Sequence, residues 1–221
     1  NGRSVCTLAD LNTLSLHPVK HFTTGEGGVI TTDNTEMARK MRVFRNHGIT
    51  TDHRQRAEQG GFFYEMVDLG YNYRLTDFQA ALGISQLKKL AGWVKKRQVI
   101  AQMYDAAFAQ IPTVSPLAVR DNVSHAYHLY MVQLELEKLS VDRATIFQAL
   151  RAEGLGVNVH YIPVHLHPYY RQNFGTGEGD CPVAEAAYER IITLPIFPQM
   201  SNSDVEDVVT AVQKVVEAFQ K

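Results

Sequence analysis

The period of the apolar residues changes repeatedly in the half of the chain that follows Pro112, and this change restricts the fold more than any other feature. Residues 126–136 alternate between apolar and polar side chains as in a β-strand. Residues 142–153 repeat with helical spacing and end before Gly154, and residues 156–161 again have a strand pattern. Strands that alternate with helices predict an α/β domain.

Two more helices are predicted nearer the C-terminus, over residues 183–192 and 204–219. Valines recur at helical spacing along the second of them, which predicts one apolar face. Ser203 and Glu206 have the spacing of a capping box at its start. We therefore predict a small C-terminal α/β domain over residues 111–221.

The first half begins with two short predicted strands, residues 13–16 and 28–32, on either side of a glycine-rich turn. Asn34 has the side chain of a helix cap, and the apolar residues after it have helical spacing as far as Arg45. Residues 46–73 show no sustained period. Long irregular segments inside a domain usually carry function, so this one is a candidate site loop.

A capping box predicts where the next helix begins. Thr76 is followed three residues later by Gln79, so the hydroxyl and the amide can each bond a backbone N–H group at the helix start. The helical pattern continues as far as Gly92, and a second helix is predicted over residues 93–110.

The charged residues balance almost completely, with 22 Lys and Arg against 23 Asp and Glu and a net charge of -1. Proteins that bind nucleic acid usually carry a basic surplus, so neither nucleic acid nor an anionic membrane is an expected partner. No apolar run approaches the ~18 residues of a membrane span, and no signal pattern begins the chain. The sequence therefore predicts a cytoplasmic protein. Cys6 and Cys181 have neither metal nor redox spacing.

The histidines raise the question of a metal site. His165 and His167 are two positions apart, and His125 and His128 three, but neither pair has a Cys or carboxylate at the spacing of a ligand set. The sequence also lacks the phosphate-loop, dinucleotide and zinc-protease motifs. We expect structural or substrate-contacting histidines and no metal.

Lys20 is the residue most suited to covalent chemistry. It lies at the predicted end of the first strand, five residues after Ser15, among aromatic, apolar and hydroxyl side chains and before the glycine-rich turn. A lysine amine that is desolvated or close to other cations becomes a nucleophile able to form Schiff bases. On spacing alone, a lysine that extends its amine to solvent is the simpler interpretation.

Five segments carry a resemblance to a known family: residues 15–28 around Lys20, 45–48 (RNHG), 69–83 (LGYNYRLTDFQAALG), 159–163 (VHYIP) and 194–198 (LPIFP). In this order they resemble the DegT/DnrJ/EryC1/StrS sugar aminotransferases, which use pyridoxal 5′-phosphate (PLP) on the aspartate-aminotransferase-like fold, type I. The resemblance spans nearly the whole chain.

This resemblance implies an α/β fold in two parts. Residues 1–110 would be the end of the large PLP-binding domain with its active-site loop and connecting helices, and residues 111–221 the small C-terminal domain. Family members carry, before the lysine segment, a phosphate-binding loop, an aromatic residue that stacks on the cofactor and an Asp that pairs with its ring nitrogen. Asp10 does not match that place. We therefore expect the chain to correspond to the C-terminal portion of the family and, by itself, to bind PLP weakly without turnover.

Two residues match family residues that bind the cofactor. Lys20 matches the lysine that binds PLP covalently, and Ser15 matches the hydroxyl that bonds its phosphate. The alternative for Ser15 is a backbone hydrogen bond at a strand end.

Four more residues, in the later segments, resemble family residues of the active site. Asn72, with Arg74 close by, resembles the residue that reaches the phosphate from the neighbouring subunit, which implies a homodimer with shared active sites. His160 and Tyr161 resemble residues beside the sugar substrate. Each pair also has a simpler interpretation. Asn72 and Arg74 would only form hydrogen bonds within the loop, and His160 and Tyr161 would be ordinary residues at the end of a strand.

The implied reaction is ping-pong transamination, with L-glutamate as donor, a nucleotide-linked keto-sugar as acceptor and Lys20 as general acid and base. Residues 17–20 and 159–163 look most like enzymes of polysaccharide biosynthesis that aminate C4 of UDP-linked 4-keto-6-deoxy-N-acetylhexosamines. Three alternatives stay open: a PLP-dependent sugar dehydratase, a PLP-binding regulator, and a non-catalytic dimerisation or substrate-binding module. Lys20 argues against the dehydratase, in which histidine replaces the lysine.

Overall fold

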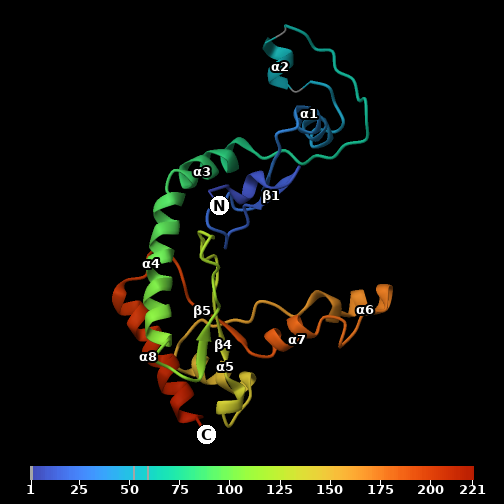
Figure 1. Cartoon of the computed structure of the whole chain (residues 1–221). Coiled ribbons are helices and arrows are strands. Elements are labelled where there is room, and N and C mark those ends of the chain that lie inside the picture. The colour runs from blue at the N-terminus through green and yellow to red at the C-terminus, as the bar shows by residue number, and fades with distance from the viewer. Residues whose placement is uncertain (1, 52, 59) are drawn as a thin grey trace. The chain divides into compact units, whose positions relative to one another are not determined.

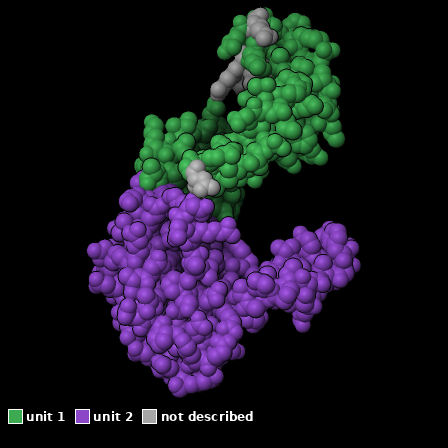
Figure 2. Space-filling model, in the orientation of Figure 1, with its two compact units in different colours: residues 1–91 green, residues 92–221 purple. Residues whose placement is uncertain are grey.

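The structure is a computed structural model that describes residues 2–51, 53–58 and 60–221. The chain divides into two units, Asn1–Ala91 and Gly92–Lys221 (Figure 2). Each unit contains one antiparallel sheet. The domain boundary predicted after residue 110 stays a prediction.

A two-stranded sheet lies near the start of the first unit. Strand β1 (Asn12–Ser15) follows a 3₁₀ turn, Val5–Thr7, and pairs with β2 (Gly28–Thr31) so that Ser15 lies opposite Gly28. Both strands fall within one residue of the predicted ranges. The connection between them contains Lys20.

Helix α1 (Thr35–Phe44) begins as predicted at Asn34, whose side chain accepts a hydrogen bond from the Met37 N–H at 2.9 Å. The prediction for the next segment was wrong in part, because helix α2 (His53–Glu58) interrupts the irregular stretch expected over residues 46–73. A helix this short does not repeat often enough for its period to be detected.

Helix α3 (Asp77–Leu87) begins at the predicted capping box of Thr76 and Gln79. It ends before Gly92, which instead lies in the first turn of helix α4 (Leu90–Phe108), so the predicted break was misplaced. One glycine costs a helix only about 1 kcal/mol, which packing readily offsets.

The second unit is built on three antiparallel strands in the order β3, β4, β5. They are β3 (Val114–Pro116), β4 (Tyr130–Leu134) and β5 (Ile191–Leu194). The strand predicted over residues 126–136 is therefore limited to β4. The end of the helix predicted over 183–192 was also wrong, because β5 begins there. All four β5 residues are buried, so they lack the alternation that distinguishes a half-exposed strand.

Residues 156–161 do not form the predicted strand, although Asn158 and Thr193 pair in an isolated bridge beside β5. The chain then leaves the sheet through a series of short helices (Figure 1). These are a 3₁₀ turn, Val164–Leu166, α6 (Pro168–Phe174) and α7 (Pro182–Tyr188).

Helices α4, α5 (Arg143–Ala152) and α8 (Asn202–Ala218) bury their apolar faces together with the strands, and a 3₁₀ turn, Leu136–Lys138, follows β4. The capping box of α8 consists of Ser201 and Asp204, not Ser203 and Glu206. Both pairs have the same spacing, so burial of Met200 against the core decides between them. Among the described residues, no helix is long and apolar enough to cross a membrane.

Candidate active site

Lys20 lies in a turn beyond β1 rather than on the strand itself, which corrects the predicted placement. Ser15 is the last residue of β1, and its Oγ accepts a hydrogen bond from the His17 N–H at 3.3 Å. The His17 carbonyl accepts from the Lys20 N–H at 3.0 Å. Pro18 has no N–H for a strand ladder, which explains why the strand ends before the lysine. His17 therefore joins Ser15 to the half-buried Lys20.

The connection that carries Lys20 is closed on itself at its base. The Leu16 N–H donates to the Gly27 carbonyl at 2.9 Å, and the Leu16 carbonyl accepts from the Thr24 N–H at 3.2 Å and the Thr23 hydroxyl at 2.7 Å. Gly27 has a φ of 146°, and a Cβ there would lie 2.8 Å from Thr24 Oγ1. Only glycine fits, which confirms the turn role predicted for this residue.

Helix α3 packs directly against this connection. A Cβ at Gly83 would lie 2.8 Å from Thr24 Cγ2, so the helix and the loop approach closely at that point. Gln86 Oε1 accepts a hydrogen bond from the Thr23 N–H at 3.1 Å. Thr24 is only 3% exposed. The segment around Lys20 is therefore held by the helix that follows Asn72 and Arg74.

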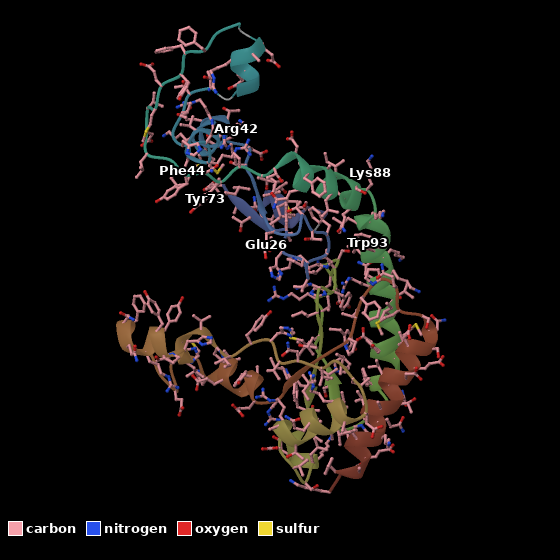
Figure 3. All side chains as sticks on the ribbon, turned by 180° about the vertical axis from the view of Figure 1, so that it is seen from behind. Glu26, Arg42, Phe44, Tyr73, Lys88 and Trp93 are labelled. Atoms are coloured by element: carbon pink, nitrogen blue, oxygen red, sulfur yellow. The ribbon has the colours of Figure 1, made fainter. Side chains whose placement is uncertain are left out.

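Asn72 and Arg74 belong to a polar cluster at another part of the first unit. The Arg74 guanidinium donates to Asn72 Oδ1 at 3.0 Å and to Asn46 Oδ1 at 3.1 Å, and it lies 3.3 Å from His47 Nε2. In Figure 3, Tyr73 lies close to Phe44 near α1, whereas Glu26 lies below α3.

The backbone brings this cluster together through close contact between two loops. The His47 N–H donates to the Tyr71 carbonyl at 2.9 Å. A Cβ at Gly48 or at Gly70 would overlap the other loop's backbone, so both positions require glycine. Asn46 and His47 were not among the predicted site residues, although their RNHG motif had marked the segment.

His160 and Tyr161 lie in the second unit, directly after the segment in which Asn158 forms a bridge with Thr193 of β5. His160 Nδ1 is 2.8 Å from Thr193 Oγ1, and the two aromatic rings of His160 and Tyr161 meet edge to face at 4.6 Å. Tyr161 is 69% exposed, whereas Thr193 is buried in β5. No local pattern marks Thr193, because its contact with His160 spans 33 residues.

A hydrogen bond between a histidine and a carboxylate joins two parts of the helical segment that follows His160. His165 Nε2 lies 2.8 Å from Glu185 Oε1, and Glu185 also accepts from the backbone N–H groups of Gly179 and Cys181. These backbone hydrogen bonds, led by Gly179, together with His165 lower the pKa of Glu185 below its ordinary value. His165 thus has a carboxylate partner that its local sequence does not show.

The folded arrangement and its motifs define a class of protein. The chain belongs to the DegT/DnrJ/EryC1/StrS aminotransferase family, whose model matches residues 1–213. This match and the solved structures below confirm the family, the α/β type I fold and PLP as the family's cofactor.

Two particular relatives act in the biosynthesis of polysaccharide and of pseudoaminic acid. The spore coat polysaccharide biosynthesis protein SpsC of Bacillus subtilis is 42% identical over 216 residues, which are 97% of this chain and 56% of SpsC. PseC of Helicobacter pylori, an aminotransferase involved in the biosynthesis of pseudoaminic acid, superposes with a TM-score of 0.88 at 31% identity, covering 99% of this chain and 56% of PseC.

A third relative bears on the cofactor. Spr1654 of Streptococcus pneumoniae, solved in its PLP-form, gives a TM-score of 0.87 at 32% identity over 98% of this chain and 54% of its own. The chain thus spans about half the length of the relatives it matches.

The residues present in the first unit fit PLP. Lys20 offers a primary amine for the cofactor aldehyde, and the exposed Ser15 offers a hydroxyl for phosphate. Arg74 and Asn72 are both exposed and offer the guanidinium and amide donors that phosphate oxygens accept. The closed loop around Gly27 gives the amine and the hydroxyl a fixed support.

Proposed function

We propose that Lys20 is the cofactor lysine of a PLP-dependent enzyme that transfers an amino group from L-glutamate to a nucleotide-linked keto-sugar. The observation that carries this proposal is the turn in which His17 bonds both the Ser15 hydroxyl and the Lys20 backbone. The family match and the closed loop around Gly27 support it.

The roles of the two residues follow from their chemistry. Bound PLP supplies an electron sink for the reacting carbon. Lys20 Nζ would hold the cofactor through its aldehyde, and the same amine would take and return the proton at the donor carbon as general base and acid. Ser15 Oγ donates a hydrogen bond to the phosphate and so orients the ring against Lys20.

A second copy of the chain completes the site in this proposal. Asn72 and Arg74 reach the phosphate of the cofactor that Lys20 of the partner subunit holds. Exposed apolar side chains on α3 and in the preceding loop support a homodimer, since Phe78 is 89% exposed and Phe62 90% exposed. Large apolar side chains exposed in this way are candidates for burial against a partner.

The proposed acceptor is a UDP-linked 4-keto-6-deoxy-N-acetylhexosamine, with His160 and Tyr161 beside the sugar. Its support is the resemblance of the VHYIP segment and the structural similarity to PseC, whose reaction serves pseudoaminic acid biosynthesis. The similarity to SpsC supports polysaccharide biosynthesis as the broader setting. The cytoplasmic location stays a prediction.

Replacement of Lys20 tests the proposal. Lys20→Ala should abolish covalent capture of PLP, measured by borohydride reduction and peptide mass. In a longer protein that contains this chain, it should also lower amino transfer by about 10³-fold or more. Lys88→Ala, an exposed lysine at the end of α3, is the matched control and should retain both. Undiminished capture in Lys20→Ala would contradict the proposal.

A measurement of visible absorbance separates a transaminase from a non-catalytic dimerisation module. A transaminase loses the visible absorbance of its lysine-bound PLP when glutamate is added, whereas a binding module keeps it. The test is made on the 221-residue chain and on any longer protein that contains it. We expect weak PLP binding by the chain alone, and full turnover by the chain alone would refute that expectation.

A further inference from the structure

Gln79 has two roles in the structure, and only one of them belongs to the capping box. Its Oε1 accepts from the Thr76 N–H at 3.1 Å and from the Thr76 hydroxyl at 3.0 Å, which completes the helix cap. Its Nε2 donates to the Glu26 carbonyl at 3.0 Å, across 53 residues of sequence. Glu26 lies on the loop that carries Lys20, below α3 in Figure 3.

The Glu26 carbonyl is a closing point of that loop. It also accepts the Thr24 hydroxyl at 2.6 Å, so Gln79 and Thr24 bind the same oxygen. The Thr24 N–H in turn bonds to the Leu16 carbonyl, directly after Ser15 at the end of β1. The Gln79 amide therefore acts on the base of the loop from which Lys20 projects.

Three residues on α3 hold this loop along one side of the helix. Gln79, Gly83 and Gln86 follow at spacings of four and three residues, which places them on one face. Gln79 donates to Glu26, Gly83 allows close approach to Thr24, and Gln86 accepts from the Thr23 N–H. The helix thus holds the loop from Thr23 to Glu26.

The same helix begins three residues after Arg74. Its N-cap, Thr76, is bonded through both its N–H and its hydroxyl to Gln79. One amide side chain consequently joins the start of the helix that continues from Asn72 and Arg74 to the loop that carries Lys20.

We propose that Gln79 is a positioning residue, whose amide fixes the Lys20 loop against the start of α3 and so sets the register between Lys20 and the Asn72–Arg74 segment. This inference rests on the proposed function, because it takes Lys20 as the cofactor lysine. A capping role alone does not require glutamine, since glutamate caps equally well at this position. The bond to the Glu26 carbonyl needs a donor, which a carboxylate lacks.

The same substitution at two positions separates these roles. Gln79→Glu keeps the capping acceptor, loses the donor and places a carboxylate against the Glu26 carbonyl. Gln86→Glu adds the same charge on the same face but keeps an acceptor for the Thr23 N–H. We expect Gln79→Glu, and not Gln86→Glu, to weaken the loop.

Amide hydrogen exchange on the protein without cofactor gives the first readout. The Leu16 and Thr24 N–H groups, which close the loop, should exchange about tenfold faster in Gln79→Glu. Both should remain near the wild-type rate in Gln86→Glu. Equal exchange in the two variants, or a wild-type rate in Gln79→Glu, would overturn the inference.

Covalent capture of PLP by Lys20 gives the second readout. Borohydride trapping at a fixed PLP concentration should slow about tenfold in Gln79→Glu and stay near wild type in Gln86→Glu. A wild-type chain that is not labelled at Lys20 contradicts the proposed function, and the exchange measurement still tests the placement of the loop. If Gln79→Glu does not fold, Gln79→Met removes the Nε2 donor without adding a charge, and a wild-type exchange rate of the Leu16 and Thr24 N–H groups in Gln79→Met overturns the inference.

Discussion

Single side chains in this protein take their orientation from partners that are distant in the sequence. Gln79 reaches Glu26, His165 reaches Glu185, and His160 reaches Thr193. Glu185 and Thr193 are marked by no local pattern, and Glu26 lies in a motif that does not indicate its contact with Gln79. The chemistry of a residue such as His160 therefore depends on a contact that only folding creates.

Removal of the Thr193 hydroxyl tests its control of His160. Thr193→Val conserves the shape of this buried side chain but removes the bond to His160 Nδ1, whereas Thr193→Ser keeps a hydroxyl. We expect the ¹⁵N shifts of the His160 ring to change in the valine variant and return in the serine variant. In a longer protein that contains this chain, the KM for the sugar should rise about tenfold in Thr193→Val with the KM for glutamate unchanged. Identical ring shifts in all three proteins would refute this role.

The Glu185 carboxylate predicts a pH dependence of stability. Because its pKa in the folded protein lies below the ordinary value of 4.5, ionised Glu185 stabilises the fold above pH 4.5, and this stabilisation is lost as pH falls through the lower folded pKa. Glu185→Gln should therefore lower the thermal midpoint at pH 7, where the His165 pair and the backbone bonds to Gly179 are intact. The difference from wild type should shrink in melts below pH 4.5, and a constant difference would contradict the assignment.

Whole elements are positioned by close backbone contacts as well as by burial. Helix α3 has only one fully buried residue, Gly83, and it is the residue that touches the Lys20 loop. Four apolar side chains of the helix, Phe78, Leu82, Ile84 and Leu87, are exposed in this chain. Its packing against the loop therefore depends on the absence of a side chain at one position.

Two glycine-to-alanine changes test this dependence in neighbouring helices. Gly83→Ala gains about 1 kcal/mol of helix propensity, but its Cβ would meet the buried Thr24 at 2.8 Å, and overpacking of this kind costs about 2 kcal/mol. Among the described residues, nothing lies within 4 Å of a Cβ at Gly92. We expect chemical denaturation to show lower stability for Gly83→Ala and equal or higher stability for Gly92→Ala. A gain in both would exclude close packing at Gly83.

At the scale of the whole molecule, the proposed sharing of active sites between two subunits has a direct consequence. If Lys20 acts with Asn72 of the partner, each mutation damages a different half of the site. Lys20→Ala and Asn72→Ala homodimers should both capture PLP poorly. In dimers exchanged from an equal mixture, about a quarter of all sites should regain both residues.

Mass spectrometry of the Lys20 peptide after borohydride reduction measures this recovery. Mixed Lys20→Ala and Ser15→Ala proteins are the control, because both residues lie in one segment and no intact site can form from them. A mixture of Lys20→Ala and Asn72→Ala with no recovery after subunit exchange would show that the site lies within one chain.

The sequence by itself determined the family, the type of fold and the elements that rest on local signals. The strands β1 and β2, the cap at Asn34 and the capping box at Thr76 depend on turn residues and short-range hydrogen bonds, which a sequence records directly. The five ordered motifs were sufficient for the family, and the match over residues 1–213 confirms it. The site residues carried over from those motifs remain predictions.

Only the tertiary structure decided the features that depend on distant contacts. All four residues of β5 are buried, so the strand does not show the alternation of apolar and polar residues. The spacing of the α8 capping box fits two pairs, and burial of Met200 favours the pair that begins at Ser201. Lys20 was displaced from the strand into a turn, because its backbone bonds to His17 and the loop is closed by Gly27. These features are stabilised by burial and by hydrogen bonds between segments that are distant in the sequence. A local pattern of apolar and polar residues does not record such contacts.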